Sequence, residues 1–429
     1  MEEKDDVADN RPEGVLSSDS SANIKLEPQG PPNGGLKAWL QILGAFFLYF
    51  NTWGIVSSYG TYERHYEDSY LRKGGSFELS TIGSVQAFMM VFLGFIAGPI
   101  FDKGYFPHLL RFGTLMILLG TITQAFSKSY WELLLSQGLC VGIGMGCLAV
   151  PALAIPPAWF TTKMPIANGI VVSAGGFGGV IYPIMVRCLI PEVGFKWTCL
   201  CVALIILITL GISNIVLRTP AGPRPKRSFL DRTAFTDVPY VLFVLGCVFT
   251  FLGLYTTFLH IAAYATQEHI TNSKVASFLV AIMNGASVFG RILPNVPAIT
   301  NRLGPLNMET VGVTSLAIIV FCWNVGPNFA GLIIMSLIYG FFVGIFFTLQ
   351  APIYARLTAN KHLIATRVGM ASTVTSIGLL IGAPAGGVLI TKHGFSAGWA
   401  WSGACLVAGA ALMATSRGLA SKWRLFASV

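Results

Sequence analysis

Long apolar runs separated by short polar breaks fill the chain from about residue 37 onward. A helix needs about 20 largely apolar residues to cross a lipid bilayer, so runs of this length predict transmembrane helices. The longest polar break, residues 218–239, has six such runs on either side. We therefore predict an all-α, polytopic membrane protein with twelve transmembrane helices in two six-helix bundles. The expected spans are 38–60, 80–100, 107–126, 131–155, 166–190, 197–217, 240–263, 275–298, 306–326, 329–353, 368–391 and 395–416.

The polar segments predict how the chain is divided. Residues 1–36 hold eight acidic and three basic side chains among many Ser, Pro and Gly, which predicts a disordered cytosolic tail. They contain neither the basic start nor the early apolar run of a cleaved signal peptide. We assign residues 37–217 to the N-terminal bundle, 218–239 to a cytosolic central loop, 240–417 to the C-terminal bundle and 418–429 to a cytosolic tail.

Lysine and arginine positions predict the orientation, because cytosolic loops carry an excess of basic residues. With the N-terminal tail inside, 15 of them fall on the cytosolic side after that tail and 8 on the outer side. In the first outer loop the charge of the basic residues is opposed by four acidic residues, Glu63, Glu67, Asp68 and Glu78. We expect a plasma-membrane protein with both termini in the cytosol, and the vacuolar membrane is the alternative.

Composition supports a membrane protein and excludes other classes. Of the 429 residues 54% are hydrophobic and 11% charged, whereas about 25% are charged in soluble domains. The net charge of +9 does not indicate nucleic-acid binding, because the basic residues lie between apolar runs and form no contiguous basic face. The 8 cysteines lie in or beside apolar runs without metal-ligand spacing, so we expect neither a metal nor a cofactor.

Glycines repeat four residues apart in several predicted spans, which produces a smooth groove along one helix face. Such grooves let helix backbones approach closely, and static packing is the simplest interpretation. For the second, fifth and eleventh spans we also expect sliding along the interface between the two bundles. The repeats are Gly94/Gly98, Gly175/Gly179, Gly340/Gly344 and Gly378/Gly382/Gly386.

Local motifs resemble the major facilitator superfamily, and within it the fungal branch of the monocarboxylate-porter-like family. The resemblance covers residues 31–417 and implies two six-helix bundles that carry a solute by alternating access. The superfamily motif is Gly98-x-x-x-Asp102-Lys103 after the second span, with a weaker echo, Asn301-Arg302-Leu303-Gly304, after the eighth. The narrower motifs are Gly34-Gly35-Leu36-Lys37-Ala38-Trp39, Phe50-Asn51-Thr52-Trp53-Gly54, Gly178-Gly179-Val180-Ile181-Tyr182-Pro183, Ala234-Phe235-x-Asp237-x-Pro239-Tyr240, Asn284-x-x-Ser287-x-x-Gly290-Arg291, Thr366-Arg367-Val368-Gly369-Met370 and Gly382-Ala383-Pro384-Ala385-Gly386.

The chain departs from the family pattern at several positions. Asn33 stands where the family has an acidic residue before the first Gly-Gly, and Leu200 replaces an arginine. Animal monocarboxylate carriers have a lysine in the first span, where this chain has Ser57 and Ser58. Their eighth-span carboxylate corresponds to Ser287. The resemblance therefore does not imply lactate-type proton symport.

Arg291 is the sharpest candidate for binding a solute. An arginine inside a hydrocarbon span costs about 2.5 kcal/mol or more, and it persists mainly where it faces a cavity or a partner. Asn284 and Ser287 lie seven and four residues before it and share its helix face. A guanidinium with neutral polar neighbours suits a carboxylate or a polarised carbonyl. The alternatives are snorkelling to the cytosolic headgroups and a structural gate.

Three further residues complete the predicted solute-binding set. His260 lies near the outer end of the seventh span, where it either takes part in function or is an interfacial polar residue. Asn51, near the centre of the first span, should face the cavity or bond another helix. The phenol of Tyr182, beside Pro183, either donates to a ligand or packs at the kink.

We expect a cytosolic gate formed by Asp102, Lys103 and Arg111, with Asn301 and Arg302 at the equivalent place in the second half. No aspartate or glutamate lies deep in a predicted span, since Asp102, Glu132 and Glu309 are near span ends. Proton coupling would therefore depend on His260, on a carboxylate near a span end or on a protonated solute. The remaining alternative is that transport is not coupled to protons.

These features predict a secondary transporter that moves a small organic solute or anion across the lipid bilayer. The chain has no H-E-x-x-H or P-loop motif, no G-x-S-x-G with catalytic partners and no intramembrane pair of acidic residues, so we do not expect an enzyme. We expect export of a secondary metabolite from a fungal cell. Uptake of a monocarboxylate or vitamin-like compound is the first alternative, and a solute sensor that does not transport is the second.

Overall fold

The computed structural model describes residues 33–69, 76–218, 230–276, 278–360 and 363–424. Within these ranges the chain is helical, with short turns between the helices and no strand. Residues 1–32, the middle of the central loop and the last five residues lie outside this description, so the predicted tails are not tested.

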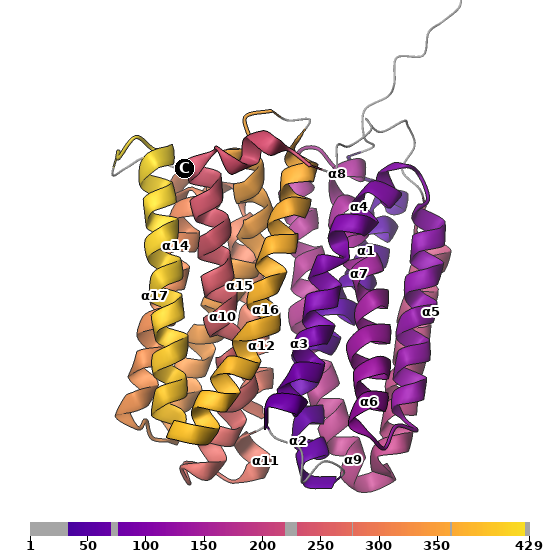
Figure 1. The fold of residues 1–429 in the computed structure, drawn as a ribbon. Coiled ribbons are helices and arrows are strands. Elements are labelled where there is room, and N and C mark those ends of the chain that lie inside the picture. The colour runs from indigo at the N-terminus through magenta and orange to yellow at the C-terminus, as the bar shows by residue number, and fades with distance from the viewer. Residues whose placement is uncertain (1–32, 70–75, 219–229, 277, 361–362, 425–429) are drawn as a thin grey trace, which may run out of the picture.

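Each half of the molecule is a bundle of long helices joined by short segments (Figure 1). The first half contains α1 (Leu36–Ser57), α2 (Tyr59–Ser69), α3 (Ser76–Phe92), α4 (Gly94–Asp102), α5 (Phe106–Gln124), α6 (Tyr130–Leu133), the π-helix η1 (Leu134–Val141), α7 (Gly142–Ala154), α8 (Pro156–Trp159) and α9 (Met164–Val216). The second contains η2 (Arg232–Phe235), α10 (Val238–Gln267), α11 (Ser273–Ala276), α12 (Phe278–Ile292), η3 (Leu293–Asn295), α13 (Pro297–Leu303), α14 (Pro305–Cys322), η4 (Trp323–Val325), α15 (Phe329–Leu357), α16 (Ile364–His393) and α17 (Phe395–Ala420).

The described residues contain 10 helices that are long and apolar enough to cross a membrane, plus one bent pair. Helix α9 has 53 residues, about 80 Å at 1.5 Å per residue, whereas a bilayer core is about 30 Å thick. It is two spans, because Gly194 breaks the helix at φ 79° and ψ 165°. With α9 counted as two spans and the bent pair as one, the prediction of twelve is confirmed.

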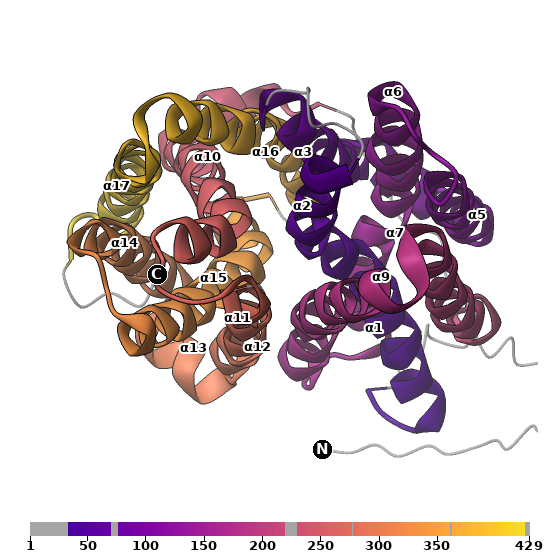
Figure 2. The same cartoon turned by 90° about the horizontal axis from the view of Figure 1, so that it is seen from below.

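The two halves lie side by side, as the views from the side and from below show (Figures 1 and 2). Helix α3 packs on α16 and α9 packs on α12 across this interface. We call the end with the turn after α4, α8 and the end of α17 the upper end, as drawn in Figure 1. The lower end carries α2, α11 and the Gly194 turn.

The first span is longer than its apolar run predicts. Helix α2 continues α1 after Ser58, and the combined span is Leu36–Glu67. Glu63, Arg64 and His65 therefore lie in a helix, and their expected place in a loop is wrong. Glu63 is 7% exposed and accepts a hydrogen bond of 2.5 Å from Ser80 on α3. Tertiary contacts of this kind keep charged residues helical where hydropathy alone indicates a loop.

The eighth span is bent where two prolines interrupt the helix. Regular helix ends at Ile292, and α13 begins at Pro297 with an axis turned by 75°. The side-chain amide of Asn295 donates to the main-chain oxygen of Arg291 at 2.8 Å and to Thr348 Oγ1 at 2.8 Å. The amide therefore satisfies a carbonyl at the broken end of the helix, as prolines in membrane helices require. The prolines therefore kink this span, and the expected unbroken helix over 275–298 is wrong.

The glycine repeats have different partners in the different spans. A Cβ at Gly176 would lie 2.7 Å from Val288 on α12, so α9 and α12 meet closely across the interface. A Cβ at Gly94 would meet Val150 on α7, and one at Gly378 would meet the carbonyl of Val248 on α10. All three spans lie at the interface as expected, since α3 packs on α16 and α9 packs on α12. Gly94 and Gly378, however, pack within their own halves and not across it. Sliding of these helices stays a prediction.

Candidate functional site

Arg291 lies at the centre of the interface and is 2% exposed. Its Nη1 donates to the main-chain oxygen of Val172 on α9 at 3.1 Å, and its guanidinium lies 5.1 Å from the ring centroid of Phe347 on α15. Nε has no partner in the described part of the chain, and no carboxylate forms an ion pair with the guanidinium. Burial excludes snorkelling in this conformation, so a permanent charge is held by one carbonyl and an aromatic face.

Asn284 and Ser287 extend the polar stripe of Arg291 along α12. They are 1% and 0% exposed, and they lie against the glycine face of α9. A Cβ on Gly176 would come within 3.2 Å of Ser287 Oγ, and one on Gly179 would overlap the Asn284 amide. The stripe on α12 and the glycines on α9 are therefore complementary surfaces, and the structure brings these three predicted residues together.

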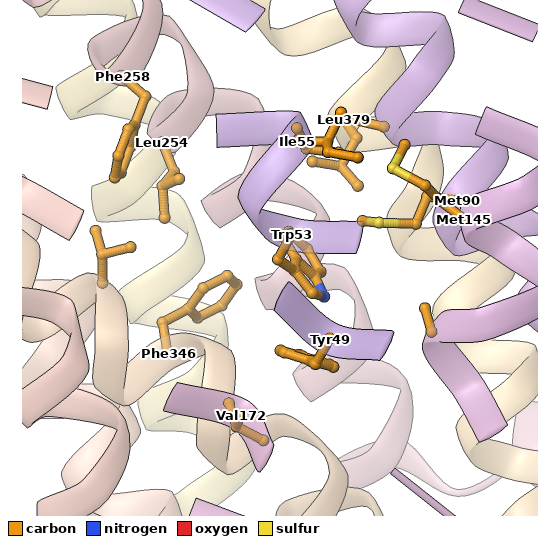
Figure 3. Packing of buried hydrophobic residues seen from close by; sticks show 14 of the residues in the cluster. Tyr49, Trp53, Ile55, Met90, Met145, Val172, Leu254, Phe258, Phe346 and Leu379 are labelled. Carbon is orange, nitrogen blue, oxygen red and sulfur yellow. The ribbon is translucent and has the colours of Figure 1, made fainter. Parts of the chain in front are cut away.

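Aromatic side chains from both halves frame the Arg291 guanidinium. Trp53 on α1 and Phe347 on α15 meet across the interface with ring centroids 4.5 Å apart. Tyr49 on α1 is also close to the guanidinium, since a Cβ on Gly175 would overlap Arg291 Nη1 and would lie 3.3 Å from Tyr49 Cε1. Figure 3 shows Trp53, Tyr49 and Val172 one below the other, with Phe346 beside them. Such a frame suits a flat organic solute as well as a cation.

Asn51 and Tyr182 are joined to each other inside the first half. The Tyr182 hydroxyl donates to Asn51 Oδ1 at 2.6 Å, and Asn51 Nδ2 donates to Thr209 Oγ1 at 2.9 Å. Both side chains are at most 1% exposed. Of the two expectations for Asn51, the bond to another helix is the one observed here, because α1 and both limbs of α9 share this network.

The lower end of the interface contains two cavities. One, of about 320 Å³, is lined by His260 together with Glu63, Glu67 and Thr391. The other, of about 240 Å³, is lined by Arg64, His65 and Arg187. Neither contains Arg291, so the central residues are occluded in this conformation. His65 in α2 is a second histidine inside a span.

The model of the Major Facilitator Superfamily matches residues 42–363, more than half of the chain. The chain belongs to this superfamily. The MFS-type transporter dbaD of Emericella nidulans is 38% identical over 86% of this chain and 82% of its own length. The fujikurins efflux protein of Gibberella fujikuroi is 32% identical over 97% and 90%. The aspyridones efflux protein apdF of Emericella nidulans is 31% identical over 94% and 84%.

The gate residues predicted from the superfamily motif lie at the upper end, and most are exposed. Asp102 ends α4 and is half-buried, whereas Lys103 and Arg111 are exposed. Asn301 and Arg302 are exposed on α13, directly after the bend that follows Arg291. Their role as a gate stays a prediction.

An ion cluster at the upper end of this superfamily member was missed in the sequence. Arg367 Nε lies 2.7 Å from Asp231 Oδ2, and Nη1 lies 2.6 Å from Asp237 Oδ2. Tyr240 donates to the main-chain oxygen of Arg367 at 2.6 Å. Burial raises the pKa of Asp231, but hydrogen bonds from Thr233 and Arg367 outweigh it, so the pKa lies below its ordinary value. The cluster joins two motifs noted in the sequence, around Asp237 and Arg367, whose contact no spacing rule predicts.

The start of the first span is attached to the loop before α9. Asn33 Oδ1 accepts hydrogen bonds from the N–H groups of Thr161 and Thr162 at 3.0 and 3.1 Å, and Nδ2 donates to Thr162 Oγ1 at 2.8 Å. Asn33 has φ 55°, a conformation that asparagine tolerates better than most residues. A carboxylate could accept the same two N–H groups, so the family's acidic residue and Asn33 can make the same attachment.

Proposed function

We propose that this member of the major facilitator superfamily exports a small organic anion, or a solute with a polarised carbonyl, from a fungal cell. Arg291, buried at the interface between the halves without an ion pair among the described residues, carries the proposal. A buried guanidinium without a carboxylate partner is costly, and an anionic solute would supply the missing counter-charge. The fork of N–H groups matches a carboxylate or a β-dicarbonyl oxygen pair.

Efflux as the direction is supported by the relatives, several of which are named as efflux proteins for fungal metabolites. The fungal monocarboxylate-porter-like branch remains the narrower assignment that the motifs favour. Import of a monocarboxylate or vitamin-like compound is the alternative. Since the basic residues predict cytosolic termini, we propose that the upper end faces the cytosol and the lower end the outside, in the plasma membrane.

Alternating access would use the boundaries predicted from the sequence, with 37–217 and 240–417 rocking as two bodies. Asn284 and Ser287 would present polar groups to the solute beside Arg291. Asn51 and Tyr182 would support the first half rather than bind solute directly, because their polar atoms are already bonded to each other. Asp102, Lys103, Arg111, Asn301 and Arg302 would form the cytosolic gate.

Proton coupling through Glu63 is the second part of the proposal. Glu63 is a carboxyl inside a span, held by Ser80, and it lines the lower cavity with His260 from the other half. Arg64 and Glu67 are the other charged groups of that cavity. Glu63 would take up a proton from the outer side when the halves separate there, so that proton entry is exchanged for solute export. In vesicles, Glu63→Gln should abolish solute-driven proton movement while counterflow persists.

Counterflow in proteoliposomes tests the transport proposal. Arg291→Ala should abolish saturable counterflow while leaving expression, membrane insertion and thermal stability close to those of the native chain. Arg356→Ala, which removes the same charge from an exposed position, should transport normally. Normal transport by Arg291→Ala would refute the site. Solute binding without flux in the native protein would indicate a sensor instead of a carrier.

A further inference from the structure

A second basic site lies at the lower end of the interface, far from Arg291. The cavity of about 240 Å³ has Arg64 from α2, His65 from α2 and Arg187 from α9 on the side of the first half. Phe258, Leu259 and Ala262 of α10 form the wall on the side of the second half. Among the residues that the structure describes, no aspartate or glutamate lines this cavity. One wall is therefore basic and the facing wall apolar.

Arg64 is poorly satisfied in this position. Its Nη2 reaches Thr266 Oγ1 on α10 at 3.5 Å, and its buried Nη1 has no hydrogen-bond partner within the described residues. The neighbouring carboxyl of Glu63 is turned to Ser80. Arg64 also lines the adjacent cavity, to which Glu63 and Glu67 belong, but no ion pair of Arg64 is observed among the described residues. A guanidinium at a partly buried site without an ion pair has unused capacity for a charge-assisted hydrogen bond.

Arg187 adds a second positive charge to the same cavity. Its guanidinium lies 5.6 Å from the ring centroid of Phe278 on α12, so it reaches toward the other half. Arg64 and Arg187 line the same cavity, so two guanidiniums face it. An anion in this cavity would fill the hydrogen-bonding capacity of Arg64 and would lie near a second positive charge.

The place of this cavity along the helices relates it to the central site. Gly175 of α9 touches the Arg291 guanidinium, and Arg187 follows twelve residues later on the same limb. At 1.5 Å per residue the two arginines are separated by about 18 Å along the span. Arg291 and the Arg64–Arg187 pair are thus successive positive positions between the centre and the lower end.

We propose that the Arg64–Arg187 cavity is an anion-binding vestibule that receives the exported solute after it leaves Arg291. Its ligand class is an organic carboxylate or phenolate with an aromatic or aliphatic body. The charged oxygens bind the two guanidiniums, and the apolar body packs on α10. Ligand pockets usually measure about 300–1,000 Å³, so this cavity holds one ring or a comparable part of a larger solute. The role of this vestibule in transport rests on the proposed export function. The affinity of the vestibule for an anion can be measured separately.

Binding of anthranilate, a fluorescent aromatic carboxylate, tests the vestibule with the full chain in lipid nanodiscs. Arg291→Gln serves as the background, because it removes the charge of the central site. In this background anthranilate should still bind, and adding Arg64→Gln or Arg187→Gln should raise the Kd roughly tenfold, as expected for one charge-assisted hydrogen bond. Adding Lys196→Gln, which removes an exposed charge elsewhere on α9, should leave the Kd unchanged. Methyl anthranilate, the neutral ester, should show no dependence on Arg64.

Several results would overturn this proposal. One is the absence of anthranilate binding in the Arg291→Gln background, and another is an unchanged Kd in both the Arg64 and the Arg187 variants. Equal sensitivity of the ester would show that charge recognition is not involved. Arg64→Lys, which keeps the charge, should recover part of the affinity if the fold is intact. Arg64-dependent binding in a native protein that shows no counterflow would refute the transport proposal and leave the vestibule standing.

Discussion

Arg291 on α12 donates from Nη1 to the main-chain oxygen of Val172 on α9, with 3.1 Å between the two atoms. The bond joins the two halves of the molecule through a carbonyl instead of a carboxylate. An ion pair buried at this depth would resist separation, because breaking it leaves two uncompensated charges. A single bond to a carbonyl holds the occluded state more weakly, which suits halves that must move apart.

The planar fork of Arg291 should be required in addition to its charge. Arg291→Lys keeps the positive charge but replaces five fixed N–H donors by a compact ammonium. We expect Arg291→Lys to retain less than about a tenth of the native transport rate, since loss of one charged hydrogen bond corresponds to roughly tenfold. Counterflow in proteoliposomes measures this, with Arg356→Lys as the exposed control. Native rates in Arg291→Lys would mean that charge alone binds the solute.

Gly175 provides a test of how closely α9 must approach α1 and the Arg291 guanidinium. A Cβ at this position would overlap the Arg291 guanidinium and would lie 2.8 Å from Trp53 Cβ on α1. The guanidinium can move away, but Trp53 Cβ is fixed to the backbone. We therefore expect Gly175→Ala to reduce transport at least tenfold and to lower the melting temperature.

Gly211 is the matched control on the second limb of the same α9, because a Cβ there would have nothing within 4 Å. Gly211→Ala should transport normally and should be unchanged or more stable by about 0.5–1 kcal/mol, the usual gain from replacing a helical glycine. Equal transport by the two variants would show that the close approach at Gly175 is not needed.

Much of this architecture could be predicted from the sequence. Apolar runs of about 20 residues indicate the spans directly, and the spacing of Asn284, Ser287 and Arg291 correctly places them on one helix face. Contacts between distant segments could not be predicted in the same way. Hydropathy alone predicts a loop for the polar residues of α2. It contains no information about the hydrogen bond that Glu63 accepts from Ser80 in the folded chain. The Arg367 cluster likewise joins positions whose pairing depends on tertiary structure.

The Tyr182–Asn51 bond should contribute mainly to stability. Tyr182→Phe removes the hydroxyl that donates to Asn51 Oδ1 and leaves a buried acceptor without this donor. We expect a loss of about 1–3 kcal/mol in unfolding free energy, the usual cost of an unsatisfied buried polar group. Tyr105→Phe, at an exposed position, should change stability by less than about 0.5 kcal/mol. Denaturant unfolding in detergent measures both. Unchanged stability of Tyr182→Phe with weakened solute affinity would instead support direct solute binding by the phenol.

The Asp231–Arg367 pair should make the upper end sensitive to acid. Because the pKa of Asp231 is lower in the folded chain than in the unfolded one, folding stabilises the carboxylate. This stabilisation is present above the unfolded pKa, about 3.9, and disappears as the pH falls through the folded pKa. The melting temperature of the native chain should therefore drop more steeply between pH 6 and pH 3 than that of Asp231→Asn, which should already be less stable at pH 7. Glu192→Gln, at an exposed position, should follow the native curve. Parallel melting curves for Asp231→Asn and the native chain would mean that the carboxylate of Asp231 adds nothing to the stability of the cluster.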